Sequence, residues 1–196
     1  MQLKTDIKFK KIKRGLKNIF GVKATNKIKK EKVLAAQKLF SDGVLVETGT
    51  YLGEMIQSVK KNFSEIYSIE LSDGLALEAV RRFKRYPHIH IINGDSGMVL
   101  ENLLKSITSP AVFWLDAHYS AGITVRSDKF GDTPIIKELE LILSNWKDRS
   151  AILIDDARLF TGKNGYPTID AVRSIAIKRN DLKLRCFVDS DIIHIF

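Results

Sequence analysis

Apolar and polar residues alternate between two periods along the chain after residue 33. Short apolar runs, typical of buried strands, are separated by longer segments in which apolar residues recur every three or four positions, typical of amphipathic helices. The pattern predicts strands at 44–46, 66–69, 89–92, 111–115 and 151–154, and helices at 33–40, 54–61, 74–86, 97–107, 134–146 and 169–179. Strands that alternate with helices in this way form a parallel sheet with helices on both faces.

The end of the chain departs from this alternation. Two apolar runs, 184–188 and 192–196, are separated only by Asp189, Ser190 and Asp191. A parallel connection needs a crossover of about a dozen residues, so these two runs must form a hairpin. The sequence therefore predicts an α/β protein with a doubly wound, Rossmann-like, mostly parallel seven-stranded sheet that ends in an antiparallel C-terminal hairpin strand.

Positive charge is concentrated at the N-terminus. Residues 1–32 contain twelve Lys or Arg and two acidic residues, whereas residues 33–196 are close to neutral. Within the first segment, apolar residues recur with helical spacing among lysines, which is a basic amphipathic helix pattern; they are Ile12, Leu16, Ile19 and Phe20. We divide the chain into a basic amphipathic arm (1–32) and one domain (33–196). The arm could lie on an anionic membrane or another polyanion, pack on the domain or on a second subunit of a homo-oligomer, or stay solvated.

The cysteine count and the hydropathy of the sequence indicate the cellular compartment of the protein. The chain has one cysteine, Cys186, which lies in an apolar run and cannot form an internal disulfide. The sequence shows no apolar run of membrane-spanning length and no secretory signal at its start. We expect a cytoplasmic location, with peripheral membrane attachment through the arm as the alternative.

The most informative motif follows the first predicted strand. Residues 44–53 read Val-Leu-Val-Glu-Thr-Gly-Thr-Tyr-Leu-Gly, in which an apolar strand leads into an acidic residue and two glycines four apart. Glycines there allow a sharp turn and a close approach of ligand to backbone. The carboxylate of Glu47 would repel a pyrophosphate but attract a ligand that carries an ammonium and a sulfonium group. This favours S-adenosylmethionine (SAM) over NAD.

Polar residues at other strand ends extend this cofactor site. Glu70 ends the second predicted strand, where a carboxylate can accept both hydroxyls of a ribose. After the third strand, Asp95 or Ser96 could bind an adenine amino group, or simply cap the following helix. The expected cofactor contacts are Glu47, Gly49, Thr50, Gly53, Glu70, Asp95, Ser96 and Asp116.

Three carboxylates follow the fourth and fifth predicted strands. Asp116 comes after the fourth strand, and Asp155 and Asp156 come after the fifth. Because the carboxyl ends of parallel strands share one crevice, the three are expected to converge. Like charges so close need a proton or a hard cation such as Mg²⁺ to neutralise them. In the alternative interpretation no metal binds: Asp155 faces the ligand, and Asp156 caps a helix or pairs with Arg158.

Taken together, residues 33–196 resemble class I SAM-dependent methyltransferases. The resemblance rests on the acidic glycine loop, Glu70, the turn at 94–96, the alternating body and the terminal hairpin; the chain departs from the usual loop at Tyr51, where a middle glycine is common. The resemblance implies that the loop lies along the methionine part of SAM and that Glu70 holds the ribose. The acids after the fourth and fifth strands further resemble metal-dependent small-molecule O-methyltransferases of the catechol and macrolide-sugar kinds, which implies a metal at Asp116, Asp155 and Asp156.

Methyl transfer to oxygen requires the acceptor to be positioned and deprotonated. His118, two residues after Asp116, is the expected base, because a neutral imidazole accepts a proton near neutral pH. A bound metal would lower the pKa of the acceptor hydroxyl. Loops at 119–133 and 158–166 would form the walls of the acceptor site. They supply the expected substrate contacts, which are Tyr119, Arg126, Arg158 and Tyr166.

The sequence therefore favours O-methylation of a small molecule, such as a saccharide or secondary metabolite, with SAM and Mg²⁺. A nucleic-acid methyltransferase is the first alternative, based on the basic arm, although the arm lacks interleaved aromatic residues for base stacking. A non-catalytic SAM-fold binding module, associated with a membrane through the arm, is the second. A nicotinamide-dependent oxidoreductase is disfavoured by Glu47 and the terminal hairpin.

Overall fold

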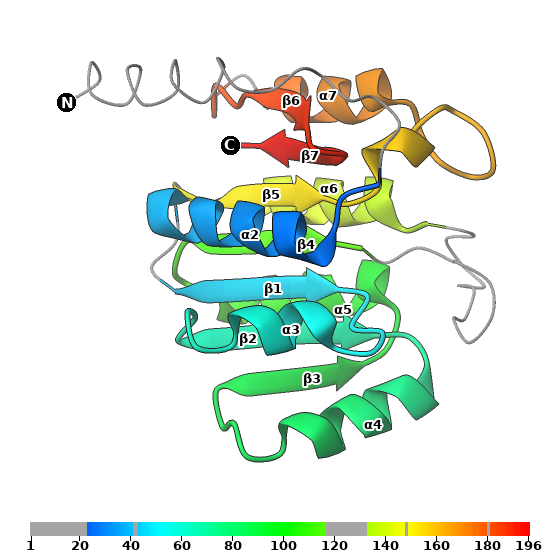
Figure 1. The fold of residues 1–196 in the computed structure, drawn as a ribbon. Helices are drawn as coiled ribbons and strands as arrows, with labels where there is room; N and C mark the ends of the chain where they lie inside the picture. Colours follow the sequence, from blue (N-terminus) through cyan, green and yellow to red (C-terminus); the bar gives the residue numbers. More distant parts are fainter. Residues whose placement is uncertain (1–22, 41–42, 117–132, 148, 180) are drawn as a thin grey trace.

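A seven-stranded sheet forms the centre of the molecule (Figure 1). The computed structural model describes residues 23–40, 43–116, 133–147, 149–179 and 181–196. The strand order in the described part is β3-β2-β1-β4-β5-β7-β6. The strands are β1 (Val44–Thr48), β2 (Glu65–Glu70), β3 (Ile89–Asn93), β4 (Ala111–Leu115), β5 (Ala151–Ile154), β6 (Cys186–Asp189) and β7 (Ile192–Ile195).

Strands β1 to β5 pair in parallel, whereas β7 is antiparallel to both β5 and β6. The predicted fold class is thereby confirmed. The terminal hairpin turns through Ser190 and Asp191, whose φ angles of 55° and 61° suit a tight two-residue turn that follows the twist of the strands. The antiparallel β7 lies next to β5, so the carboxyl edge of the sheet is bordered on that side by the hairpin turn.

Helices cover both faces of the sheet. On one face lie α2 (Asn26–Phe40), α3 (Glu54–Val59) and α4 (Asp73–Phe83), and on the other lie α5 (Ser96–Ser106), α6 (Ile135–Ser144) and α7 (Ile169–Lys178). A short 3₁₀ turn, η1 (Ala157–Leu159), follows β5. Each face has its own apolar cluster. This arrangement explains why the central strands read as continuous apolar runs: both of their faces are buried.

Alternation along each strand assigns residues to one face or the other. In β4, Val112 and Trp114 belong to the cluster beneath α2, α3 and α4, whereas Phe113 and Leu115 belong to the opposite cluster. Successive side chains of a strand point to opposite faces. The same alternation decides on which face of the sheet the polar residues just beyond each strand end lie.

Helix α2 begins well before its predicted start. The pattern predicts a helix from residue 33, but the structure begins it at Asn26, so the predicted boundary at residue 32 falls inside α2. Val33 and Ala36 are buried against the sheet, and Lys29 lies one turn before Val33 on the same side of the helix. The inner face of α2 therefore extends towards the N-terminus beyond the predicted start. Residues 26–32 are thus part of the folded domain. Among the described residues, no helix is both long and apolar enough to span a membrane.

The packing of α2 generates a stability prediction. Val33 is fully buried and Leu39, on the same helix, is 45% exposed. We expect Val33→Ala to lower the free energy of unfolding by about 1.5–3 kcal/mol, since two buried methyl groups are lost and a cavity remains. Leu39→Ala should change it by less than about 0.5 kcal/mol. Urea unfolding of both variants measures the difference; equal effects would show that α2 does not contribute to the core.

Candidate functional site

The loop after β1 has the backbone geometry of a ligand-binding turn. Gly49 and Gly53 have φ angles of 83° and 70°, and the Gly53 N–H donates to the Thr50 carbonyl at 2.8 Å. A Cβ at Gly53 would lie only 2.7 Å from the ring of Phe83, so no other residue fits there without movement. Tyr51 also has a positive φ, 48°, which explains why a glycine is common at this place in the resembled loop.

Glu70 lies directly beside this loop. Its carboxylate accepts the Tyr51 N–H at 2.8 Å through one oxygen and the Ser72 N–H at 2.9 Å through the other. The β2 carbonyl of Glu70 also accepts the Gly94 N–H at 2.9 Å, which ties the loop after β3 to the same place. The prediction that Glu70 and the glycine loop share one site agrees with this geometry, while the contact with a ribose stays a prediction.

Glu47 is fully enclosed near the end of β1. It pairs in register with Ser68 on β2, and the Ser68 hydroxyl donates to its carboxylate and lies 2.6 Å from the Thr50 hydroxyl. Burial, opposed by the hydrogen bond from Ser68 and assisted by the charges of Asp116 and Glu70, raises the pKa of Glu47 to about 8. A carboxyl group held in this way would become ionised when a cation binds beside it.

The turn after β3 contains Asp95 and Ser96, for which the sequence left both helix capping and adenine binding open. Asp95 is the N-cap of α5, and its carboxylate accepts the Gly97 N–H at 2.9 Å. Ser96 is buried as the first residue of the helix. Capping is confirmed, and the adenine contact of either residue stays a prediction.

The three carboxylates after β4 and β5 do not form one cluster. Asp116 and Asp155 each follow by two residues a side chain that faces α2, Trp114 and Leu153, and so lie on the α2 side. The Asp155 N–H donates to the Leu115 carbonyl at 3.1 Å. Asp156, at a φ of 55°, forms its ion pair with Arg158. Within the described residues, no group of three or more His, Cys, Asp or Glu could hold a metal ion.

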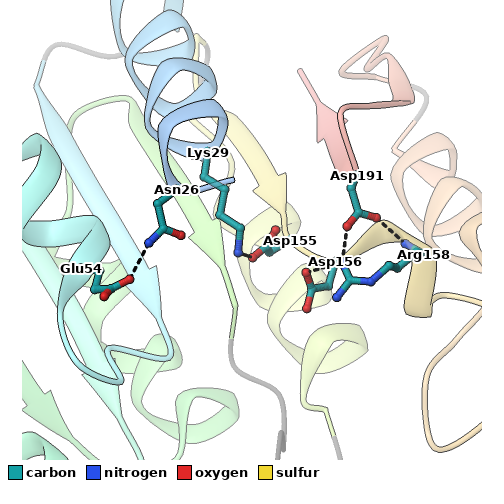
Figure 2. A network of polar contacts seen from close by, with 7 residues as sticks. All are labelled: Asn26, Lys29, Glu54, Asp155, Asp156, Arg158 and Asp191. Carbon is teal, nitrogen blue, oxygen red and sulfur yellow. Dashed lines mark hydrogen bonds and ion pairs between the residues drawn. The ribbon is translucent and has the colours of Figure 1, made fainter. Parts of the chain in front are cut away.

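Two cationic side chains bind the carboxylates instead (Figure 2). Lys29 of α2 forms an ion pair with Asp155, and Arg158 binds Asp156 at 2.7 Å and also Asp191. Burial alone would lower the pKa of Lys29, but Asp155 and Asp116 outweigh it and raise the pKa. The Asp156–Arg158 pair of the alternative interpretation is confirmed. Arg158 is thus held within the protein, which disfavours its predicted role as an acceptor contact.

A small pocket opens beside these groups at the carboxyl edge of β4 and β5. Its lining includes the acids Asp116, Glu138 and Asp155, the aromatic residues Phe160 and Tyr166, and Leu115, Thr133, Ile135 and Ile154. The rings of Phe160 and Tyr166 meet edge to face, with centroids 5.5 Å apart. Tyr166 therefore lies where the predicted acceptor wall was expected. His118, Tyr119 and Arg126 lie outside the described residues, and their roles stay predictions.

Glu138 of α6 is the functional candidate that the sequence interpretation missed. It is 1% exposed, and burial raises its pKa to about 7, while the nearby Ser96 and Thr48 hydroxyls oppose this rise. Neither Glu138 Oε1 nor Thr48 Oγ1 makes a hydrogen bond of ordinary geometry among the described residues. A signal was present: Glu138 interrupts the apolar stripe of Ile135, Leu139 and Ile142. A charged residue on a buried helix stripe often has a chemical role.

Comparison with solved structures shows that the protein has the fold of class I SAM-dependent methyltransferases. The O-methyltransferase of Bacillus cereus in complex with S-adenosylhomocysteine (SAH) matches with a TM-score of 0.58 and 15% identity, covering 87% of this chain and 78% of that chain. An rRNA methylase of Streptococcus thermophilus matches with a TM-score of 0.50 and 15% identity, covering 87% of this chain and 94% of that chain.

Sequence comparison gives a shorter match. Ribosomal RNA small subunit methyltransferase A of Dehalococcoides mccartyi is 32% identical over 80 residues, covering 41% of this chain and 24% of the relative. The chain spans less than half the length of the curated relatives it matches. No protein-family model matches the sequence.

The environment of Glu47 generates a prediction about pH. Its folded pKa of about 8 lies above the ordinary value of 4.5, so the folded state holds a proton that the unfolded state releases between these values. Stability should therefore fall as pH rises through this window. In Glu47→Gln the loss should be smaller by on the order of a few kcal/mol, because the amide cannot ionise in either state.

Urea unfolding of the cofactor-free protein at about pH 5 and about pH 8 provides the measurement. Glu78→Gln on the exposed side of α4 is the matched control and should retain the wild-type slope. If Glu47→Gln and the wild type lose stability equally over this range, the buried carboxyl is not protonated as described.

Proposed function

We propose that the protein is a SAM-dependent methyltransferase that methylates a hydroxyl group of a small molecule. The observation that carries this proposal is the continuity of two half-sites on one sheet edge. The glycine loop and Glu70 lie at the ends of β1 and β2, and the acidic pocket lies at the ends of β4 and β5. The Asp116 N–H donates to the Thr48 carbonyl at 3.0 Å, so the two halves meet where β1 and β4 pair.

The residues of the first half-site fit the cofactor. The left-handed glycines leave the loop backbone open to close approach, and Glu70 has the position of a ribose acceptor. Asp116 supplies negative charge for the ammonium and sulfonium groups, and Glu47 adds to it when the bound cation displaces its proton. When bound, SAM supplies a methyl group on a positively charged sulfur atom, which takes back the bonding electron pair on displacement.

The second half-site suits a neutral acceptor that donates hydrogen bonds. Its polar lining is dominated by the carboxyl groups of Asp116, Glu138 and Asp155, which accept hydrogen bonds and repel anions. A hydroxyl group can donate to these oxygens, whereas a phosphate cannot. The lining therefore favours a saccharide or another hydroxylated small molecule over an anionic acceptor.

Glu138 is the base in this proposal. A carboxyl group with a pKa of about 7 is matched to proton transfer near neutral pH. The acceptor O–H would donate to Glu138 Oε1, and the proton would pass to the carboxylate as the acceptor oxygen forms its bond to the methyl carbon. His118 remains a second candidate for this role.

Magnesium assistance does not fit the described residues. Asp155 is engaged by Lys29 and Asp156 by Arg158. No step in this proposal passes through a metal.

Methylation of ribosomal RNA is the second candidate function. The match to ribosomal RNA small subunit methyltransferase A supports it, as does the basic segment at residues 1–32. An RNA acceptor would bring phosphates towards a pocket that three carboxylates line, which is unfavourable. Steep salt dependence of RNA binding, lost on deletion of residues 1–22, would favour this alternative.

Cofactor binding provides the first functional prediction. We expect SAH to bind the wild-type protein and to bind Glu70→Gln at least about tenfold more weakly, because an amide replaces one ribose acceptor by a donor. Isothermal titration calorimetry measures both. Glu65→Gln, at the opposite end of β2, is the control and should bind as the wild type does. Binding of NADH in place of SAH would refute the cofactor assignment.

The proposed role of Glu138 as the base provides the second functional prediction. Glu138→Gln should lower kcat by about 10²- to 10⁴-fold while SAH affinity stays unchanged, since the base is lost but the cofactor half-site is intact. Glu140→Gln, on the exposed face of the same helix, is the matched control. SAH release is measured with monosaccharides, catechols and ribosomal RNA as acceptors. The wild-type rate should rise with pH through about 7, and the variant should lose this limb.

Each outcome of this assay is informative. Full activity of Glu138→Gln would exclude it as the base, and turnover of RNA alone would favour the second candidate function. SAH binding without turnover of any acceptor would support a non-catalytic binding module.

A further inference from the structure

Lys29 is the cationic side chain that reaches the carboxyl edge of the sheet from α2. Its ammonium forms an ion pair with Asp155, whose side chain is completely buried, and lies 5.9 Å from the centre of the Trp114 ring. Lys29 itself is 12% exposed. Asp116, on the neighbouring strand, adds a second favourable charge interaction. A lysine enclosed to this extent is a built feature of the site, unlike Lys27 and Lys38, which are exposed on the same helix.

Helix α2 is fastened around this contact. Before Lys29, the Asn26 amide donates to Glu54 of α3 at 2.6 Å, and after it Lys32 forms an ion pair with Asp189 at the end of β6. One turn after Lys29, Val33 is buried against the sheet. Figure 2 shows the Lys29 side chain directed from α2 towards Asp155, with the Asn26–Glu54 contact to its side. These contacts fix both the position of the ammonium and its approach to Asp155.

Only one oxygen of Asp155 is used by Lys29. The ion pair involves Oδ2, whereas Oδ1 is buried and makes no hydrogen bond within the described residues. Asp155 also lines the pocket. An acceptor oxygen held in such a position is suited to a hydrogen-bond donor that enters the pocket.

We propose that Lys29 is a built-in cation of the site, which fills the place beside Asp116 and Asp155 that a divalent metal would otherwise take and holds Asp155 so that Oδ1 faces an acceptor. The ion pair stands independently of the activity of the protein. The function of Oδ1 as an acceptor contact rests on the proposed methyl transfer. Lys29 is in this sense a positioning residue that acts through Asp155.

The first test removes the cation and asks whether a metal replaces it. In Lys29→Met, the Asp116–Asp155 pair loses its ammonium, and we expect it to bind Mn²⁺ at least tenfold more tightly than the wild type. Electron paramagnetic resonance of free Mn²⁺ measures the binding. Lys32→Met, which breaks the ion pair with Asp189 away from the pocket, is the matched control and should bind as the wild type does. The double variant Lys29→Met, Asp155→Asn should lose the added binding.

Several results would overturn the proposal. These are no gain of Mn²⁺ affinity in Lys29→Met, an equal gain in Lys32→Met, or wild-type Mn²⁺ binding that Asp155→Asn abolishes. Lys29→Gln serves as a second variant, with thermal unfolding and circular dichroism to establish that each protein is folded. None of these measurements requires turnover, so they stand even if the proposed methyl transfer fails.

The second test applies where turnover is observed. Lys29→Met should raise the KM for the acceptor at least fivefold with a smaller change in SAH affinity, Lys29→Arg should restore most of the loss, and EDTA should leave the wild-type rate unchanged. Loss of SAH affinity to the same extent as acceptor affinity would indicate general disruption of the fold, and loss of the wild-type rate with EDTA would indicate that a metal does act.

Discussion

The burial of carboxyl groups at one edge of the sheet is the constraint on which the site depends. Glu47, Glu70, Asp116, Glu138 and Asp155 all belong to this edge, and all except Asp116 are buried. Removing a carboxylate from water is costly unless it is protonated, hydrogen-bonded or paired with a cation. The protein uses all three means: Glu47 and Glu138 have raised pKa values, Glu70 accepts two backbone N–H groups, and Asp155 binds Lys29. The result is an edge with unused capacity for positive charge and hydrogen-bond donors.

Strand parity determines which of these groups can cooperate. Glu47, Asp116 and Asp155 follow the residues that face α2. The charge of Asp116 acts on both Glu47 and Asp155, and Asp116 and Asp155 both act on Lys29. Glu138 approaches from α6 on the opposite face, near Thr48 and Ser96. The pocket lies where both sets meet beyond the strand ends. In the proposed reaction, Glu138 would therefore approach the acceptor from the face of the sheet opposite to Asp155 and Lys29.

The fold was predictable from the sequence because its signals are local. Apolar runs marked the strands, a short polar link required the terminal hairpin, and the glycine pattern marked the turn that follows β1. The acceptor half-site was less predictable because its signals depend on parity and on contacts between distant segments. The pair Asp155 and Asp156 reads as one acidic motif, yet Asp155 pairs with Lys29, whereas Asp156, at a left-handed φ, pairs with Arg158. Glu138 was overlooked because a charged residue in a helix usually faces solvent, and Lys29 because the charge pattern placed it in the basic arm.

Acids at the ends of β4 and β5 do not by themselves specify a metal site. They specify a concentration of negative charge, which either a divalent ion or a lysine can reduce. The two solutions differ physically. A metal exchanges with solvent and imposes its own coordination geometry, whereas a lysine is attached to a helix and brings its packing with it. In this protein the packing of Val33 and Ala36 carries Lys29 to Asp155, so the order of the acceptor half-site is linked to the docking of α2. A sequence segment that reads as the end of a basic arm is thereby part of the site's own structure.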